Sequence, residues 1–221
     1  MPVILKIEHA DGQKTAVWEI TEDEFKLLEL AKLNKTDSIR LSLISNHGRR
    51  LEWLATRALL TQFYTAIPSI DYKENGKPFF NDLKDKISIS HSGTMVAIAL
   101  HSTQTPGIDI EMLNQRIFKI ATRFLGDEEK VAIGNNPTVE ELTIVWGAKE
   151  VLFKIYEHGE VSFKEDLLVK PFKISPRGSF SGIIKKDDKN AHIPMEYMQI
   201  GNYMMVHTNY SYSDFEKNSE L

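Results

Sequence analysis

The segment Gly107–Glu111 constrains this chain more than any other, because two carboxylates, Asp109 and Glu111, alternate there with isoleucines. Alternate side chains of a β-strand share a face, so the pattern predicts a strand with its isoleucines in a core and both acids on the opposite face. A strand with a solvated acidic face would have the same pattern. The dipeptide Pro106–Gly107 at the start of the strand favours an acid pair that faces a functional cleft instead.

A second charged pair lies in the segment Trp146–Lys154, which belongs to a helix predicted over residues 139–156. Glu150 and Lys154 stand four residues apart and therefore share a face of that helix. An exposed pair at this spacing contributes only a few tenths of a kcal/mol. The neighbouring residues are mostly apolar, where charges are costly unless they face a site. Gly147 is interpreted as a tolerated residue or a close backbone approach that does not touch the chemistry.

The three acids match the ligand preferences of a hard metal ion. Mg²⁺ takes oxygen ligands, usually one or two carboxylates, and leaves the other positions to water and phosphate oxygens. Asp109, Glu111 and Glu150 fit that count. No His or Cys falls at zinc-ligand spacing nearby. The sequence therefore predicts Mg²⁺-dependent chemistry on a phosphate group.

A strand predicted over Ile87–Ser90 leads into His91 and ends in hydroxyl groups and an imidazole. Ser90 and His91, with the backbone amides near Gly93, could hold a phosphate. A histidine in a capped turn or a satisfied core position stays an open alternative. A hydrolytic Ser-His-Asp triad is disfavoured because the sequence has no Gly-x-Ser-x-Gly elbow.

Basic residues precede this strand. Arg49 and Arg50 lie at the predicted start of a helix over residues 49–67, where the helix dipole attracts anions. Lys77 lies in the turn Asn75–Pro78, which would present its ammonium group rigidly. Each of them alone could be a solvated charge, but together they predict an anion-binding edge.

Composition narrows the class of protein. The net charge of −4 gives no argument for nucleic acid, and no apolar run reaches membrane-spanning length. The chain has no cysteine and its start lacks a signal-peptide core, so we expect a cytoplasmic protein.

The predicted fold class is α+β, with residues 1–104 as an N-terminal half that carries the anion-binding edge and residues 105–221 as a C-terminal half that carries the acids. Residues 72–80 are expected to form a loop. The strands expected after Gly159 cover residues 162–163, 172–174, 179–184, 195–200 and 203–208.

In this order, the motifs resemble those of the 4′-phosphopantetheinyl transferases, in particular the long, surfactin-synthetase type. The matching segments are Asn75–Pro78, Ile87–Ser92, Gly107–Glu111 and Trp146–Lys154. The resemblance implies two similar α+β halves in a pseudo-twofold arrangement, with the active site in the cleft between them. It implies a holo-[acyl-carrier-protein] synthase that moves the phosphopantetheine group of coenzyme A onto a serine of an apo acyl or peptidyl carrier protein. The other product would be adenosine 3′,5′-bisphosphate, and the enzyme would be a monomer.

The resemblance also implies roles for the acidic residues and the lysine of the helix. Asp109 and Glu111 would hold Mg²⁺ against the pyrophosphate of coenzyme A. Glu150 would either complete the metal site or take the proton from the carrier serine. Lys154 would offset charge on the pyrophosphate and on the leaving group.

The coenzyme's phosphates would be bound by Ser90 and His91, with His91 taking the 3′-phosphate. Lys77 and one of Arg49 or Arg50 would assist. Two alternatives stay open. One is a module that binds coenzyme A or a carrier protein without catalysis, and the other is a Mg²⁺-dependent pyrophosphate hydrolase that uses the same acids on water.

Overall fold

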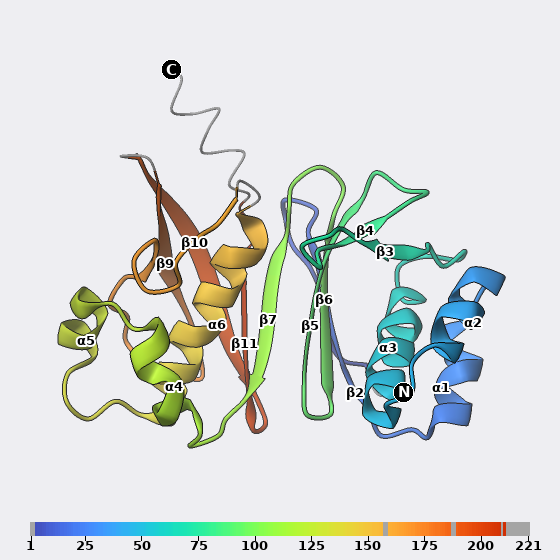
Figure 1. Cartoon of the computed structure of the whole chain (residues 1–221), viewed down its shortest axis with the longest axis horizontal. Helices are drawn as coiled ribbons and strands as arrows, with labels where there is room; N and C mark the ends of the chain where they lie inside the picture. Colours follow the sequence, from blue (N-terminus) through green and yellow to red (C-terminus); the bar gives the residue numbers. More distant parts are fainter. Residues whose placement is uncertain (1–2, 157–158, 187–188, 209, 211–221) are drawn as a thin grey trace. The chain divides into compact units, whose positions relative to one another are not determined.

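The computed structural model describes residues 3–156, 159–186, 189–208 and 210 of the chain. Within these residues, helices alternate with antiparallel sheets, which confirms the predicted α+β class. The chain divides into two compact units, Met1–Thr103 and Gln104–Leu221 (Figure 1). The polar tail of residues 211–221, expected from the sequence to fray, lies outside the described part. The predicted pseudo-twofold arrangement and its cleft stay predictions.

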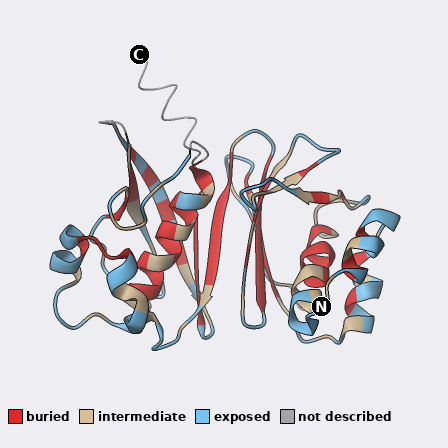
Figure 2. Ribbon diagram, in the orientation of Figure 1, coloured by how far each residue is buried: buried red, intermediate tan, exposed pale blue. Residues whose placement is uncertain are grey.

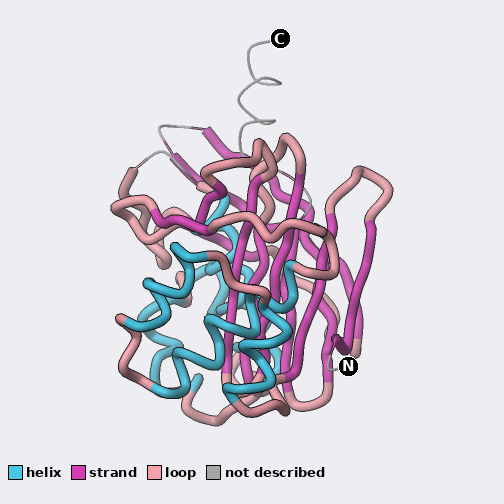
Figure 3. The backbone as a smooth tube through the Cα atoms, turned by 90° about the vertical axis from the view of Figure 1, so that its right-hand side faces the viewer, coloured by secondary structure: helices cyan, strands magenta, loops and turns pink. Residues whose placement is uncertain are grey.

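The N-terminal unit is built on a four-stranded antiparallel sheet with the strand order β1-β2-β6-β5. Its elements are β1 (Val3–Glu8), β2 (Lys14–Glu19), α1 (Glu24–Ala31), α2 (Lys35–Ser42), α3 (His47–Leu60), β3 (Ile70–Tyr72), β4 (Pro78–Phe80), β5 (Lys86–Ser92) and β6 (Met95–His101). The three helices lie on one face of the sheet, and α3 packs against β2 and β6 (Figure 3). The core between them includes Trp18, Leu54, Leu59 and Ile98.

Helix α3 begins after Asn46, whose side-chain oxygen accepts a hydrogen bond from the Arg49 amide at 3.0 Å. Such a cap satisfies one of the amides that a helix start leaves without an intrahelical partner. Arg49 and Arg50 therefore lie in the first turn of α3, as predicted. The helix ends at Leu60, earlier than the predicted Ile67.

The segment between α3 and β5 is more ordered than the sequence indicated. The predicted loop of residues 72–80 is confirmed for the turn at residues 73–77 and wrong at its two ends, where β3 and β4 pair as an antiparallel hairpin. Arg40 of α2 holds this hairpin, since its guanidinium donates to the Ile70 carbonyl at 2.6 Å and pairs with the Asp71 carboxylate. The hairpin carries the turn Asn75–Pro78, so these contacts position that turn.

The C-terminal unit is built on a five-stranded antiparallel sheet with the order β7-β11-β10-β9-β8. Its elements are β7 (Gly107–Met112), α4 (Ile117–Phe124), α5 (Asp127–Ile133), α6 (Val139–Ile155), β8 (Leu167–Val169), β9 (Arg177–Lys186), β10 (Lys189–Ile200) and β11 (Tyr203–Thr208). The expected strands at 162–163 and 172–174 are wrong. Phe163 and Phe172 instead pack against other aromatic rings, at Trp146 and at Phe180.

Helix α6 is the central element of this unit. It begins with a capping box in which Thr138 and Glu141 satisfy each other's backbone amides. It packs against β7 and β11, and most of its residues are buried (Figure 2). Asp109 and Glu111 of β7 and Glu150 and Lys154 of α6 therefore come from two elements that are in contact. Across the described residues, no helix has the length and apolar character needed to cross a bilayer.

Candidate active site

Strand β7 lies unusually close to α6 because of Gly107. A Cβ atom at this position would lie 2.8 Å from side-chain carbons of Val151 and Ile155, closer than real Cβ atoms come to other heavy atoms. β7 also pairs with β11, with Asp109 opposite Val206 and Glu111 opposite Met204. The glycine therefore allows the strand that carries the acids to pack directly on the helix.

Asp109 forms an ion pair with Lys154. The lysine Nζ lies 2.8 Å from Asp109 Oδ1 and donates a second hydrogen bond to the Ile108 carbonyl at 2.8 Å. Asp109 is only 4% exposed, so it does not belong to a solvated acidic face. A buried carboxylate needs such a charged partner, and the pair fixes both groups at the contact between β7 and α6.

Glu111 is held by a residue that the sequence did not single out for the site. The indole Nε1 of Trp146 donates to Glu111 Oε1 at 3.0 Å. The Trp146 ring is itself stacked on Phe163 and lies against Phe124, with ring centroids 5.6 and 5.3 Å apart. Two features of the sequence could have indicated a role for Trp146. It precedes Glu150 by one helical turn, and an indole N–H that is shielded from water requires an acceptor.

Glu150 is the third acid, and its environment opposes its ionisation. Burial, followed by repulsion from Asp109 and Glu111, raises the pKa of Glu150 to about 7, while Lys154 acts in the opposite direction. The carboxylates of Asp109 and Glu111 are thus close enough to act on Glu150. A carboxyl group with a pKa near neutrality is suited to accept a proton at physiological pH.

Gly147 provides the close backbone approach that was one of its two interpretations from the sequence, and this approach lies beside Asp109, which the sequence interpretation did not expect. A Cβ at this position would lie 3.4 Å from Asp109 Oδ2 and 3.1 Å from Val206 Cγ2. Glycine costs a helix interior about 1 kcal/mol relative to alanine. Here the absence of a side chain leaves room for the Asp109 carboxylate against the helix.

Lys149, next to Glu150 in sequence, points away from these acids and is fully buried. Its Nζ donates to Glu129 Oε2 at 2.6 Å and to the carbonyls of Phe124 and Phe163 at 2.5 and 2.7 Å. Burial lowers the pKa of Lys149, while Glu129 opposes that shift. All three ammonium donors are thus used, so Lys149 fixes α6 to its neighbours.

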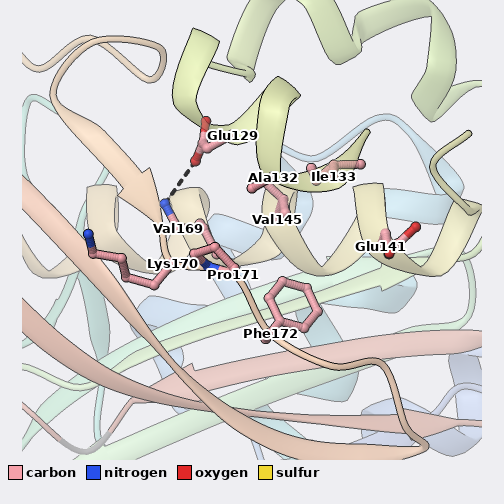
Figure 4. Close-up of a pocket in the computed structure, with 9 residues that line it drawn as sticks. All are labelled: Glu129, Ala132, Ile133, Glu141, Val145, Val169, Lys170, Pro171 and Phe172. Atoms are coloured by element: carbon pink, nitrogen blue, oxygen red, sulfur yellow. Dashed lines mark hydrogen bonds between the residues drawn. The ribbon is translucent and has the colours of Figure 1, made fainter. Parts of the chain in front are cut away.

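The partner of Lys149 extends this network to β8. Glu129 Oε1 accepts from the Val169 amide at 2.8 Å, and Oε2 also accepts from the Gly126 amide at 2.8 Å (Figure 4). The small cavity beside Glu129, which also borders Val145 and Phe172, has a volume of about 40 Å³. That is far below the size of a ligand pocket, so we assign this region to support of α6.

The acids provide a donor set that fits Mg²⁺ in chemical type, with two carboxylates on one strand and a third on the adjoining helix. Among the described residues, however, no three His, Cys, Asp or Glu side chains converge closely enough to hold a metal ion. Lys154 is bound to one oxygen of Asp109. A Mg²⁺ ion would therefore rely on Asp109 and Glu111, with other oxygens completing its coordination.

The N-terminal unit contains a cavity of about 790 Å³, a size suited to a nucleotide-like ligand. It is lined by Arg40, Leu43, Ile44, Ser45, Asn46, Arg49, Glu52, Trp53, Thr56, Arg57, Tyr72, Gly76, Pro78, Ile89 and His91. The guanidinium and imidazole groups outnumber the single carboxylate of the lining, which favours an anionic ligand. His91 Nδ1 lies 3.4 Å from Glu52 Oε2, which holds the imidazole toward α3.

Only some of the predicted phosphate-binding residues line this cavity. Arg49 and His91 do, whereas Arg50, Lys77 and Ser90 are not among its described lining residues. Lys77 lies between two lining residues of the hairpin turn, and Ser90 is buried on β5. The contacts of Arg50 serve the fold instead.

Arg50 ties the first turn of α3 to the helices before it. Its Nε and Nη2 lie 2.9 and 2.5 Å from Glu24 Oε1, and its Nη1 donates to the carbonyls of Leu41 and Ile44. The sequence could not separate Arg49 from Arg50, because both fall in the same helical turn. Their contacts separate them, since Arg50 faces the protein and Arg49 the cavity.

The C-terminal unit is thus an α+β domain in which the contact between β7 and α6 brings Asp109, Glu111, Glu150 and Lys154 together. The family model of the 4′-phosphopantetheinyl transferase superfamily matches residues 105–205. This segment of the chain therefore belongs to that superfamily, as the motifs predicted. The surfactin-synthetase-type branch stays a prediction.

Individual relatives agree with the family match. The 4′-phosphopantetheinyl transferase AcpT of Escherichia coli K12 is 34% identical over 112 residues, which cover 48% of this chain and 57% of that protein. AcpT of Salmonella typhimurium LT2 is 32% identical over 112 residues, which cover 48% of this chain and 58% of that protein. The chain thus spans little more than half the length of the relatives it matches.

Proposed function

We propose that this protein transfers the 4′-phosphopantetheine group of coenzyme A to a serine of an apo carrier protein, as a Mg²⁺-dependent holo-[acyl-carrier-protein] synthase. The observation that carries the proposal is the contact between β7 and α6, where Asp109, Glu111, Glu150 and Lys154 lie together within the segment that matches the superfamily. The names of the relatives, both of them 4′-phosphopantetheinyl transferases, support the same reaction.

The reaction needs a base, charge neutralisation and in-line positioning. The serine oxygen attacks the phosphorus of the phosphopantetheine half, and the bond from that phosphorus to the bridging oxygen breaks. Adenosine 3′,5′-bisphosphate leaves with the bridging oxygen. The proton of the serine hydroxyl passes to Glu150, whose pKa of about 7 suits a group that must accept and then release a proton at neutral pH.

Asp109 and Glu111 would hold Mg²⁺, and the ion when bound would neutralise charge on the pyrophosphate oxygens. Trp146 keeps Glu111 oriented for that role. Lys154 forms an ion pair with Asp109 and would share its positive charge with the pyrophosphate. A Glu150 that ligates the metal would be a poor base, and the pKa of about 7 in the free protein favours the role of base.

The proposed binding of coenzyme A rests on the cavity of the N-terminal unit. Arg49 and His91 line it and would bind phosphate groups, His91 the 3′-phosphate. His91→Ala should weaken binding of coenzyme A far more than binding of 3′-dephospho-coenzyme A. Equal losses for the two compounds would remove His91 from that role.

The test of the whole proposal is intact-mass spectrometry of an apo acyl carrier protein after incubation with the chain, coenzyme A and Mg²⁺. We expect a gain of one phosphopantetheine, which disappears when Mg²⁺ is chelated and when Asp109 is replaced by Ala. A peptidyl carrier protein is the second substrate to try. If neither carrier is modified, free phosphopantetheine would indicate hydrolysis, and intact coenzyme A would indicate a binding module.

A further inference from the structure

The turn of the β3–β4 hairpin contains the only Asn-Gly pair of the chain, Asn75–Gly76. Both residues are exposed, and Gly76 has a φ of 81°, a left-handed conformation that suits glycine. The Asn75 side-chain oxygen accepts a hydrogen bond from the Lys77 amide at 3.2 Å, so the carboxamide folds forward along the turn. The side-chain carbonyl carbon of Asn75 and the backbone nitrogen of Gly76 thus lie in one compact, exposed turn.

Two features of this turn favour attack of the Gly76 nitrogen on the Asn75 side chain. Gly76 has no side chain to shield its nitrogen, and apart from its chain neighbours no described heavy atom lies within 4 Å of where its Cβ would be. The hydrogen bond from Lys77 also draws electron density away from the Asn75 carbonyl carbon.

One feature of the turn opposes the attack. The Gly76 N–H donates to the Lys73 carbonyl at 2.8 Å, and the Lys73 N–H donates to the Lys77 carbonyl at 2.9 Å. The attacking nitrogen must first be released from its acceptor. We therefore expect opening of the hairpin turn to limit the rate of the reaction in the folded chain.

The β1–β2 hairpin has the same turn with an aspartate in place of the asparagine. Asp11 Oδ1 accepts from the Gln13 amide at 3.1 Å. Gly12 has a φ of 92°, and its N–H donates to the His9 carbonyl at 3.0 Å. The chain thus already forms this turn with a carboxylate. An ordinary aspartate at residue 75 would keep the turn, whereas an isoaspartate, which adds a carbon atom to the main chain, would not.

We propose that Asn75–Gly76 is a site of spontaneous deamidation, at which the chain converts its own hairpin turn to a mixture of aspartate and isoaspartate. The Gly76 nitrogen bonds to the Asn75 side-chain carbonyl carbon, and the side-chain nitrogen leaves as ammonia with the proton that the Gly76 nitrogen gives up. Water then adds to one carbonyl carbon of the resulting succinimide and returns a hydrogen to the nitrogen as that bond breaks. Opening at the side-chain carbonyl gives aspartate, and opening at the main-chain carbonyl gives isoaspartate.

The consequence of deamidation for binding rests on the function proposed above. Gly76 and Pro78 of this turn are among the residues that line the cavity of the N-terminal unit. The conversion adds a negative charge beside a lining that favours anionic ligands, and the extra main-chain atom of isoaspartate displaces the turn. We expect stored protein to have a higher KM for coenzyme A and an unchanged kcat, because the reaction does not alter the acids of β7 and α6.

The test is peptide mapping by mass spectrometry of the full chain after storage at mildly alkaline pH, with an isoaspartyl methyltransferase assay for isoaspartate. Asn75 should lose ammonia before Asn34 and Asn46, whose side chains also accept a backbone hydrogen bond but precede larger residues. Equal conversion of these asparagines, or an intact Asn75 after a urea-unfolded sample has converted it, would overturn the proposal. Isoaspartate at residue 75 in a chain that modifies no carrier would sustain it and reject the proposed function.

Two variants test the control of the reaction by the hairpin. Arg40 holds the hairpin through the Ile70 carbonyl and the Asp71 carboxylate. Arg40→Ala should therefore speed ammonia loss from Asn75 by about 2- to 10-fold, the factor that corresponds to one lost hydrogen bond. Arg123→Ala, which removes an exposed arginine of α4, should leave the rate unchanged. Equal rates for the two variants would overturn the role of turn opening, and the map of the unaltered chain decides the site itself.

Asn75→Asp separates the effect of deamidation on binding from other effects of storage. This variant has no carboxamide to lose, so its KM for coenzyme A should rise more slowly during storage than the KM of the parent chain. Circular dichroism should show that it folds as the parent does, because the β1–β2 hairpin forms the same turn with Asp11. An equal rise in KM for the two proteins would reject the expected effect of deamidation on coenzyme binding.

Discussion

The indole N–H of Trp146 and the carboxylate of Glu111 are hydrogen-bonded at 3.0 Å, which joins α6 to β7 at the acidic site. Glu111 is thereby oriented by a side chain whose ring is held between other aromatic rings. A residue that hydrogen-bonds to a metal ligand changes how tightly that ligand binds the metal, although the residue itself does not contact the metal.

Trp146→Phe should therefore raise the Mg²⁺ concentration needed for half-maximal transfer by about 10-fold or more, the usual loss when a metal ligand loses its supporting partner. The matched control is Trp18→Phe, which removes an indole that donates to Glu22 at 3.3 Å in the N-terminal unit. That variant should leave the Mg²⁺ dependence unchanged. Identical Mg²⁺ titrations for Trp146→Phe and the parent chain would show that the hydrogen bond does not prepare Glu111.

The pKa of Glu150 should make stability fall as the pH rises. The carboxyl has a pKa of about 7 when folded and 4.5 as its ordinary value, so the folded state binds more protons between these two pH values. Stability is then highest below about pH 4.5 and is progressively lost up to about pH 7, by at most about 3 kcal/mol for this group. Urea unfolding across this range should show a shallower fall for Glu150→Gln. Parallel curves for the two proteins would contradict the raised pKa.

Gly147→Ala should separate activity from stability. The added methyl group gains about 1 kcal/mol of helix propensity but crowds Val206, the residue of β11 that pairs with Asp109. We expect the unfolding free energy to change by less than about 1 kcal/mol, while the transfer rate falls at least about 10-fold because a shift of Val206 moves Asp109 with it. Gly48→Ala in α3, where the nearest contact is the Asn46 side chain, is the control. Unaltered transfer by Gly147→Ala would mean that the site absorbs the methyl group.

Lys149→Met should destabilise the fold by about 3–5 kcal/mol, because it leaves the Glu129 carboxylate buried without its cation. Lys130→Met breaks an exposed pair with Asp127 and should leave the unfolding free energy almost unchanged. Chemical denaturation measures both. The double variant Lys149→Met with Glu129→Gln should recover part of the loss, and a double variant as unstable as the sum of the single ones would argue against the pair.

Substitutions of Arg49 and of Arg50 should have different effects, although the two residues are adjacent in the sequence. Arg49→Ala should raise the KM for coenzyme A about 10-fold with little effect on unfolding, since Arg49 lines the cavity. Arg50→Ala should lower the unfolding free energy more than Arg49→Ala does, because it frees Glu24 and two carbonyls from their donor. Steady-state kinetics and thermal melts on both variants distinguish them, and the reverse pattern would exchange their roles.

The strand and helix that carry the acids were predictable because their signals are local. Two alternating acids in Gly107–Glu111 and a long apolar helix with a capping box at Thr138 need no knowledge of tertiary contacts. The strands β9, β10 and β11 also followed from their apolar patterns, although β9 and β10 are longer than expected.

The elements that were missed depend on distant residues. Helix α2, Lys35–Ser42, is polar and short, and it is held by the cap at Asn34 and by the buried Asp37 near Arg57. The β3–β4 hairpin has strands of three residues each, too short for a periodic pattern, and needs Arg40. Likewise, Trp146 and Lys149 could be assigned only once their partners, Glu111 and Glu129, were known.

The four charged residues of the acidic site all come from β7 and α6, within one unit, whereas the described residues that line the cavity of about 790 Å³ belong to the other unit. If the proposed function holds, a substitution in α3 would change how firmly the donor coenzyme A is held and would leave the proposed catalytic carboxylates untouched. Among descendants of one ancestral gene, the choice of donor and the chemistry performed on it are therefore free to diverge at different rates.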